Sequence, residues 1–344
     1  MTELNWGLLG TGRIASMEMG PAIVAARRSR LAAVASRESS RARELADRLG
    51  AGRAYGSYEE LLADPRVDAV YIALPNSLHR EWTLAALAAG KHVLCEKPLG
   101  LSASEVRDIS AAATATGLVV MEAFMWRFHP RTRRAQELVD SGSIGEVQSI
   151  QTSYTVLSQA IADPAQAATS IRFKPELGGG ALGDLGCYCI DGLRLFAGSP
   201  PVEVSSRRTG WPGTDVETTT WGEMRFANGT IGQFFASMEG AGGTHIEVIG
   251  TTGRLRLQTA FRLPPTLETV TLEVTTDGET TTETFPNLNQ YRLEAEHFAS
   301  LVLDGESPRI PLADSLENAL ALDAVRRSWA TVGSAPVRLL DAGS

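Results

Sequence analysis

Short apolar runs alternate with helical patterns over the first third of the chain. The apolar runs predict strands over residues 4–9, 31–35, 68–74, 91–96 and 118–121. The helical patterns between them cover residues 40–49, a segment up to about 89, and residues 102 to about 116, each followed by a glycine. Alternation of strands and helices predicts parallel strands joined by crossover helices, which is a doubly wound sheet.

The pattern changes after about residue 125. Helices are expected over about 131–140, 181–196, 290–303 and 314–331. Turn pairs between alternating runs predict three hairpins, at Asn228-Gly229, at Thr251-Thr-Gly253 and at Asp277-Gly278. Successive hairpins indicate an open, mostly antiparallel sheet.

The length of 344 residues is too great for one ordinary core. We therefore expect two domains. The first is an α/β domain with a doubly wound parallel sheet over residues 1–124. The second is an α+β domain over residues 125–344, whose last residues could pack back on the first domain.

Composition excludes several classes of protein. Lys and Arg number 32 and Asp and Glu number 40, a net charge of −8, which opposes a nucleic-acid surface. The sequence contains no stretch of about 20 apolar residues, so no membrane span is predicted. The predicted strand at 4–9 leaves no room for a signal peptide, so we expect a cytoplasmic location.

Three cysteines without a CxxC pattern predict neither a disulfide framework nor a zinc site. The five histidines lack metal-ligand spacing, so no metal is expected.

A glycine pattern follows the first strand directly. Gly10-Thr11-Gly12-Arg13-Ile14-Ala15 has the form GxGxxA at a strand-to-helix turn. Gly10 would make the tight turn, Gly12 would let the backbone approach a pyrophosphate, and Ala15 would allow close helix packing. The alternative is a tight glycine turn without a ligand.

The tip of the next strand indicates which dinucleotide binds. An NAD enzyme is expected to carry an acid here for the ribose 2′-hydroxyl. Instead the strand ends in Ser36 and Arg37, with Arg41 nearby. A hydroxyl and guanidinium groups suit a 2′-phosphate, which favours NADP over NAD. A surface arginine near Glu38 is the alternative.

Two further motifs could carry chemistry. Lys97, in Glu96-Lys97-Pro98, follows a strand at the edge where doubly wound sheets bind ligands. Asp184 and Tyr188 lie four residues apart in a glycine-rich helix and share one face. A solvated lysine is the alternative for the first motif, and a buried Tyr–Asp pair at a domain interface is the alternative for the second.

In order, these motifs resemble the Gfo/Idh/MocA oxidoreductase family over nearly the whole chain. The resemblance rests on five blocks, at residues 10–15, 75–79, 96–98, 122–130 and 178–188. It implies an N-terminal Rossmann domain and a C-terminal sheet whose face forms a homodimer or a dimer of dimers. It also implies a set of cofactor-binding residues beyond the glycine turn and the strand tip: Leu74, Pro75, Asn76, His79, Glu96, Lys97, Trp126 and Arg127.

The resemblance implies a mechanism as well. Tyr188 matches the catalytic position, Asp184 a substrate-positioning acid, and Lys97 a lysine that contacts substrate. A free tyrosine has a pKa near 10, too high for an efficient base at neutral pH. We therefore expect the ammonium group of Lys97 to lower the pKa of Tyr188.

Three functions agree with these residues. The first is an NADP-dependent oxidoreductase of a sugar or cyclic polyol, of the aldose 1-dehydrogenase or dihydrodiol dehydrogenase type, with an exchangeable cofactor. The second is a ketoreductase of a nucleotide-linked keto-sugar, in which the segment Arg172-Phe173-Lys174 could bind the diphosphate. The third is a catalytically idle protein that senses NADP or sugar. Substrate choice is expected to depend on loops near residues 156–177 and 235–245.

Overall fold

The computed structural model describes residues 2–158, 161, 169–210, 216–331 and 337–338. The chain divides into two compact units. The first contains Met1–Phe128 and Asn289–Leu316, and the second contains His129–Leu288 and Glu317–Ser344. The division falls after Phe128, whereas the sequence pattern placed the domain boundary after residue 124. The segment that returns to the first unit is 289–316. The last residues of the chain, 339–344, which were expected to pack back on the first domain, lie outside the described residues.

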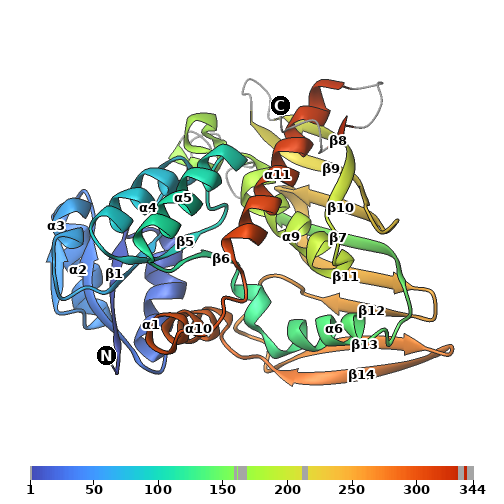
Figure 1. Cartoon of the computed structure of the whole chain (residues 1–344), viewed down its shortest axis with the longest axis horizontal. Coiled ribbons are helices and arrows are strands. Elements are labelled where there is room, and N and C mark those ends of the chain that lie inside the picture. Colours follow the sequence, from blue (N-terminus) through green and yellow to red (C-terminus); the bar gives the residue numbers. More distant parts are fainter. Residues whose placement is uncertain (1, 159–160, 162–168, 211–215, 332–336, 339–344) are drawn as a thin grey trace. The chain divides into compact units, whose positions relative to one another are not determined.

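A six-stranded parallel sheet forms the centre of the first unit (Figure 1). Its strands are β1 (Leu4–Leu9), β2 (Ser29–Ala35), β3 (Arg53–Tyr55), β4 (Ala69–Ile72), β5 (His92–Glu96) and β6 (Val120–Ala123). The order β3-β2-β1-β4-β5-β6 confirms the expected doubly wound sheet. The strand order reverses between β1 and β4: successive strands are added on one side of β1 up to β3, and on its other side from β4 onward. Ligands are therefore expected at the carboxyl ends of β1 and β4.

Helices cover this sheet. They are α1 (Gly20–Ala25), α2 (Ser39–Leu49), α3 (Tyr58–Leu62), α4 (His79–Ala88), α5 (Ala103–Thr116) and α10 (Gln290–Asp304). Their ends follow local rules: the side chain of Ser102 accepts from the Glu105 amide at the start of α5, and Gly117 ends that helix at φ 68°. Helix α10, although distant in sequence, lies beside α1 (Figure 1).

The second unit is built on a nine-stranded sheet in the order β14-β13-β12-β11-β7-β10-β9-β8-β15. The strands are β7 (Val147–Leu157), β8 (Pro201–Gly210), β9 (Glu217–Phe226), β10 (Ile231–Ser237), β11 (Glu239–Gly250), β12 (Gly253–Gln258), β13 (Thr269–Thr276), β14 (Glu279–Pro286) and β15 (Val337–Arg338). All neighbouring pairs are antiparallel except β7 with β10. All three predicted hairpins are present, and the mostly antiparallel sheet is confirmed.

Helices α6 (Pro130–Asp140) and α9 (Cys187–Ala197) pack on the sheet of the second unit. A π-helical turn, η6 (Leu182–Gly186), leads directly into α9. The last long helix, α11 (Leu312–Ser328), contains the unit boundary after Leu316. In the part of the chain that the structure describes, no helix combines the length and apolar character needed to cross a bilayer.

Candidate active site

The glycine turn after β1 has the geometry that a dinucleotide needs. Gly10 has a φ of 102°, and a β-carbon there would lie 2.8 Å from the Ala73 carbonyl oxygen at the end of β4. Gly12 is exposed, and a helical segment runs from Arg13 to Ala25 after it. The first amide groups of a helix lack partners within it and attract anions. These residues therefore fit a pyrophosphate.

Cationic side chains gather at the tip of β2. Ser36 is buried and its hydroxyl accepts from the Glu38 amide at 3.3 Å. Arg37 and Arg41 are exposed. Burial raises the pKa of Tyr58, and the nearby guanidinium of Arg37 offsets part of that rise. Arg41 reaches the Glu38 carboxylate at 3.5 Å across exposed surface, a weak pairing that a phosphate could displace. This end of the first unit fits the 2′-phosphate of NADP.

The loop after β4 is held by a buried histidine. One ring nitrogen of His79 lies 3.0 Å from the Leu74 carbonyl oxygen, and the other lies 2.7 Å from that of Pro98. The side chain is fully buried, and burial lowers its pKa. His79 thus ties the loop that carries Pro75 and Asn76 to the segment after β5.

Glu96 is the last residue of β5, and Lys97 follows it. The hydroxyl of Tyr71, on the neighbouring strand β4, donates to Glu96 Oε1 in a short hydrogen bond. The Lys97 backbone amide lies 3.3 Å from Glu96 Oε2. Glu96 is nearly buried and Lys97 is half-buried. The Glu96 carboxylate therefore supports the backbone that carries Lys97.

A short 3₁₀ turn, η3 (Met125–Phe128), carries Trp126 and Arg127, which the resemblance placed among the cofactor-binding residues. Trp126 is fully buried. Arg127 is also buried, and its guanidinium donates to the Asp314 carboxylate at 3.1 Å. That ion pair joins the end of the Rossmann sheet to the returning segment 289–316.

In the second unit, the glycine run 178–180 allows close backbone approach. A β-carbon on Gly179 would lie 2.6 Å from the Arg172 carbonyl oxygen, and the Gly180 amide donates to that same oxygen at 2.9 Å. Gly180 has a φ of 112° and packs on the carboxylate of Glu217. That carboxylate accepts from the Leu182 amide at 3.1 Å, at the start of η6. The glycines therefore fix the segment of Arg172 against the turn that carries Asp184.

Asp184 lies in η6, and π-helical turns recur at functional sites. Arg172 donates to its carboxylate at 2.5 Å. The Arg172 side chain is 53% exposed and that of Asp184 22% exposed. The Asp184 charge is the main reason that the pKa of Arg172 is raised. Sequence reasoning named both residues but did not predict that they pair.

Tyr188 follows one turn later and is held by aromatic neighbours. Its ring centroid lies 5.5 Å from that of Tyr154 on β7 and 5.6 Å from that of Phe261, which follows β12. Tyr154 and Phe261 stack on each other at 5.6 Å. Such pairs stabilise beyond the area that they bury. Sequence reasoning missed both neighbours, because a tyrosine in an unpredicted strand and a phenylalanine in a loop carry no local signal.

The predicted site residues fall into both units. The glycine turn, the β2 tip, His79, Glu96, Lys97, Trp126 and Arg127 belong to the first unit, and Asp184 and Tyr188 belong to the second. The prediction of a loop near 235–245 is wrong, because these residues form the end of strand β10 and the start of β11. The loop expected near 156–177 lies partly outside the described residues, which omit 159–160 and 162–168.

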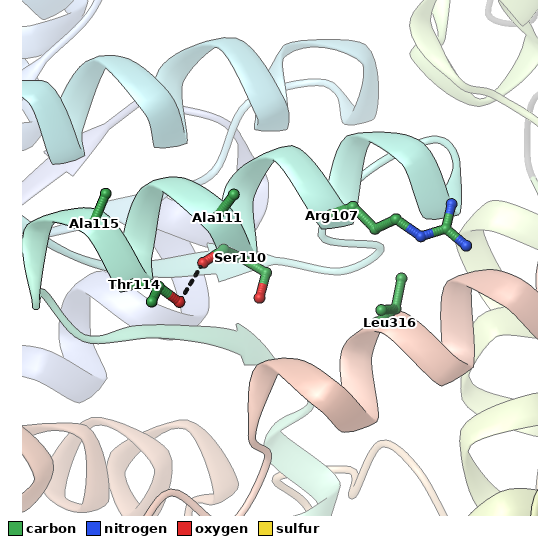
Figure 2. Close-up of a pocket in the computed structure, with 6 residues that line it drawn as sticks. All are labelled: Arg107, Ser110, Ala111, Thr114, Ala115 and Leu316. Carbon is green, nitrogen blue, oxygen red and sulfur yellow. Dashed lines mark hydrogen bonds between the residues drawn. The ribbon is translucent and has the colours of Figure 1, made fainter.

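The first unit also has a surface groove on α5. Figure 2 shows it along α5, with Arg107, Ser110 and Thr114 on that helix and Leu316 opposite. None of the predicted site residues lines it. Within the described ranges, no three His, Cys, Asp or Glu side chains cluster as metal ligands would.

Comparison with known proteins gives matches over nearly the whole chain. Residues 4–124 match the oxidoreductase family with an NAD-binding Rossmann fold, and residues 132–256 match the GFO/IDH/MocA C-terminal domain. A D-xylose 1-dehydrogenase (NADP⁺) of Haloferax volcanii is 40% identical over 95% of this chain and 98% of its own. A trans-1,2-dihydrobenzene-1,2-diol dehydrogenase of Xenopus laevis is 32% identical over 93% of this chain and 96% of its own.

A solved structure shares the complete fold. The 3-ketoreductase of Actinomadura kijaniata, in complex with NADP and TDP-benzene, superposes with a TM-score of 0.87 at 34% identity. The match covers 95% of this chain and 98% of that one. Family matches over both domains and relatives above 30% identity along the full length agree with the site just described. The chain therefore belongs to the GFO/IDH/MocA family of oxidoreductases.

Proposed function

We propose that this protein is an NADP-dependent dehydrogenase of an aldose or a related cyclic polyol. The observation that carries the proposal is the arrangement at η6, where Asp184 and Tyr188 lie one turn apart. Asp184 offers a carboxylate that can bind a substrate hydroxyl, and Tyr188 offers a phenol that can transfer a proton. The full-length similarity to a D-xylose 1-dehydrogenase supports the same class of reaction.

The first unit supplies the cofactor site in this proposal. The turn from Gly10 to Ile14 would hold the pyrophosphate, and Ser36, Arg37 and Arg41 would hold the 2′-phosphate. When bound, NADP⁺ supplies the hydride acceptor for oxidation of a CH–OH group. Pro75, Asn76, Trp126 and the Lys97 segment would surround the nicotinamide end. His79 would act indirectly, since both ring nitrogens already face backbone carbonyls.

The protein's own residues move the proton. Tyr188 would accept the proton of the reacting hydroxyl, and would return it in the reverse direction. Its aromatic neighbours fix the ring, so the hydroxyl is oriented before substrate arrives. Asp184 would accept a hydrogen bond from a second substrate hydroxyl in place of Arg172. That Lys97 lowers the pKa of Tyr188 stays a prediction, because the two residues belong to different units.

A second candidate is reduction of a nucleotide-linked keto-sugar. A dTDP-3,4-didehydro-2,6-dideoxy-α-D-glucose 3-reductase of Actinomadura kijaniata is 35% identical over 93% of this chain. The half-exposed guanidinium of Arg172 is a cation of the kind that a diphosphate would need. The same active-site residues serve both candidates, so substrate tests must separate them.

Initial rates with purified enzyme distinguish these candidates. NADPH formation would be followed with NADP⁺ and a panel of aldoses, inositols and a dihydrodiol, and NADPH consumption with a dTDP-linked keto-sugar. We expect NADPH formation with an aldose, and its loss in Asp184→Asn. Turnover of the dTDP-sugar alone would favour the second candidate. NADPH binding without any turnover would favour a sensor.

Two further properties belong to the proposal. We infer a homodimer formed through the open face of the second unit's sheet, where Trp221 on β9 and Phe235 on β10 lie directly opposite each other and are 38% and 42% exposed. Aromatic side chains are enriched in protein interfaces. A cytoplasmic location is supported by Cys95, Cys187 and Cys189, which are all buried free thiols.

A further inference from the structure

An acidic side chain lies in the interior of the first unit without any hydrogen-bond partner among the described residues. Glu294, on α10, is fully buried, and neither carboxyl oxygen is within hydrogen-bonding reach of a described donor. Ionised carboxylates are almost never buried without a donor or a cation, because the loss of hydration is not compensated. The group is therefore expected to be neutral.

The register of the sheet shows which residues face Glu294. Trp6 of β1 packs against Phe298, one turn after Glu294, with ring centroids 5.0 Å apart. Leu8 lies beside Tyr71, and Tyr71 lies beside Leu94. Because side chains alternate along a strand, Trp6, Tyr71 and Glu96 all point to the sheet face that α10 covers.

Two acids thus share one buried region behind Lys97. Glu96 accepts from the Tyr71 hydroxyl and from the Lys97 amide, which stabilises its ionised form. Burial raises the pKa of Glu294 well above its usual range, and the charge of Glu96 raises it further. Burial and the same charge raise the pKa of Tyr71, so its hydroxyl keeps the proton that it donates. Two carboxylates in one dry site cannot both ionise readily.

Several other charged groups around α10 have partners, whereas the buried Nε of Arg292, on α10 itself, has none among the described residues. On the elements packed against it, Arg127 of η3 binds Asp314, and Glu18 of the π-helical turn η1 (Ala15–Met19) lies 3.9 Å from Arg13. On α10 itself, Glu296 binds Arg27, and His297 accepts from the Arg309 amide. Tyr291, also on α10, is a further titratable group near Tyr71.

We propose that Glu294 is a positioning residue that remains a neutral carboxylic acid, so that a single negative charge, on Glu96, is held behind Lys97. That charge keeps Glu96 bonded to Tyr71 and to the Lys97 amide. Ionisation of Glu294 would place a second negative charge beside Glu96 and displace it. The catalytic part of this inference rests on the proposed function, whereas the protonation state of Glu294 does not.

Glu294→Gln tests the protonation state directly. The amide matches the neutral acid in shape and cannot ionise. A carboxyl group whose folded pKa lies above its unfolded pKa contributes full stability only below the unfolded value, and loses it as pH rises through the folded value. The melting temperature of the variant should therefore exceed that of the wild type by a margin that grows by about 3 °C per pH unit as pH rises above about 5.

A control and a spectroscopic measurement accompany that test. Glu296→Gln removes a paired carboxylate two residues further along the same helix, and should show no such gain with pH. The infrared carbonyl band of a protonated carboxyl group should be present in the wild type at neutral pH and missing in Glu294→Gln. A gain that is constant or falls with pH, or a wild type without the band, would overturn the inference.

The positioning role has its own measurement. In Glu294→Gln, kcat at neutral pH should stay within about twofold of the wild type, and the alkaline fall of kcat should move to higher pH. NADPH affinity should show the same change in its pH dependence. An unchanged alkaline limb in both would refute the positioning role. If the enzyme turned over no substrate, the melting and infrared results would still decide the protonation state.

Discussion

At the residue scale, we expect individual side chains to decide which cofactor this enzyme prefers. Ser36 and Arg37 stand where an acid would bind the ribose of NAD, and the sequence could name them as candidates because the tip of a strand is a fixed position in this fold. Tyr154 and Phe261 could not be identified in that way. Their contact with Tyr188 depends on three elements meeting in space, and nothing in their local sequence marks it.

Arg37→Ala should reduce the preference for NADP. Loss of a charge-assisted contact of about 1.5–3 kcal/mol predicts a fall in kcat/KM for NADP⁺ of about 10- to 100-fold, with little change for NAD⁺. Steady-state kinetics with both cofactors measure this. Arg43→Ala, an exposed arginine on α2, is the matched control and should leave both values unchanged. Equal losses with both cofactors in Arg37→Ala would contradict a 2′-phosphate contact.

At the scale of elements, the strongly patterned segments were predicted well. The parallel strands and the three hairpins follow from apolar runs and turn residues, which are local signals. Strand β7 was missed although it lies in the middle of its sheet. Its buried side includes Thr152, so the alternation of apolar and polar residues is weak. The π-helical form of η6 was also not predicted, since it depends on packing of the glycine run.

Gly180→Ala should destabilise the second unit. The backbone angle is unfavourable for an L-residue, and the new methyl group would lie 2.4 Å from the Glu217 carboxylate that caps η6. We expect a loss of about 2 kcal/mol in the free energy of unfolding, measured with denaturant. Gly198→Ala, with a φ of 58° and open space around it, should lose only about 1 kcal/mol. Equal losses would contradict close packing at Gly180.

The whole molecule shows an organisation that local patterns did not reveal. Residues 289–316 return to the first unit after strands β7 to β14 of the second sheet and before β15. Their helical pattern was evident, but the partner of a helix is set by long-range packing. Through this return, α10 brings Glu294 under the Rossmann sheet and Asp314 reaches Arg127.

The proposed dimer can be tested at the same scale. Trp221→Glu combined with Phe235→Glu places two like charges opposite each other on the open sheet face. The wild type should behave as a dimer or a dimer of dimers in sedimentation analysis, and the double variant as a monomer with its fold retained. The control, Arg107→Glu combined with Ala111→Glu on the groove of α5, should leave the oligomeric state unchanged. An unaltered oligomer in the double variant would exclude this face.

The central claim is that Tyr188 transfers the proton in an NADP-dependent oxidation of a sugar hydroxyl. The most direct measurement compares kcat and NADPH affinity in the wild type and in Tyr188→Phe, which keeps the aromatic contacts. We expect kcat to fall by about 10²- to 10⁴-fold, with NADPH affinity and melting temperature nearly unchanged. Near-normal turnover in Tyr188→Phe would contradict the account and move the search for the acid–base group to another residue.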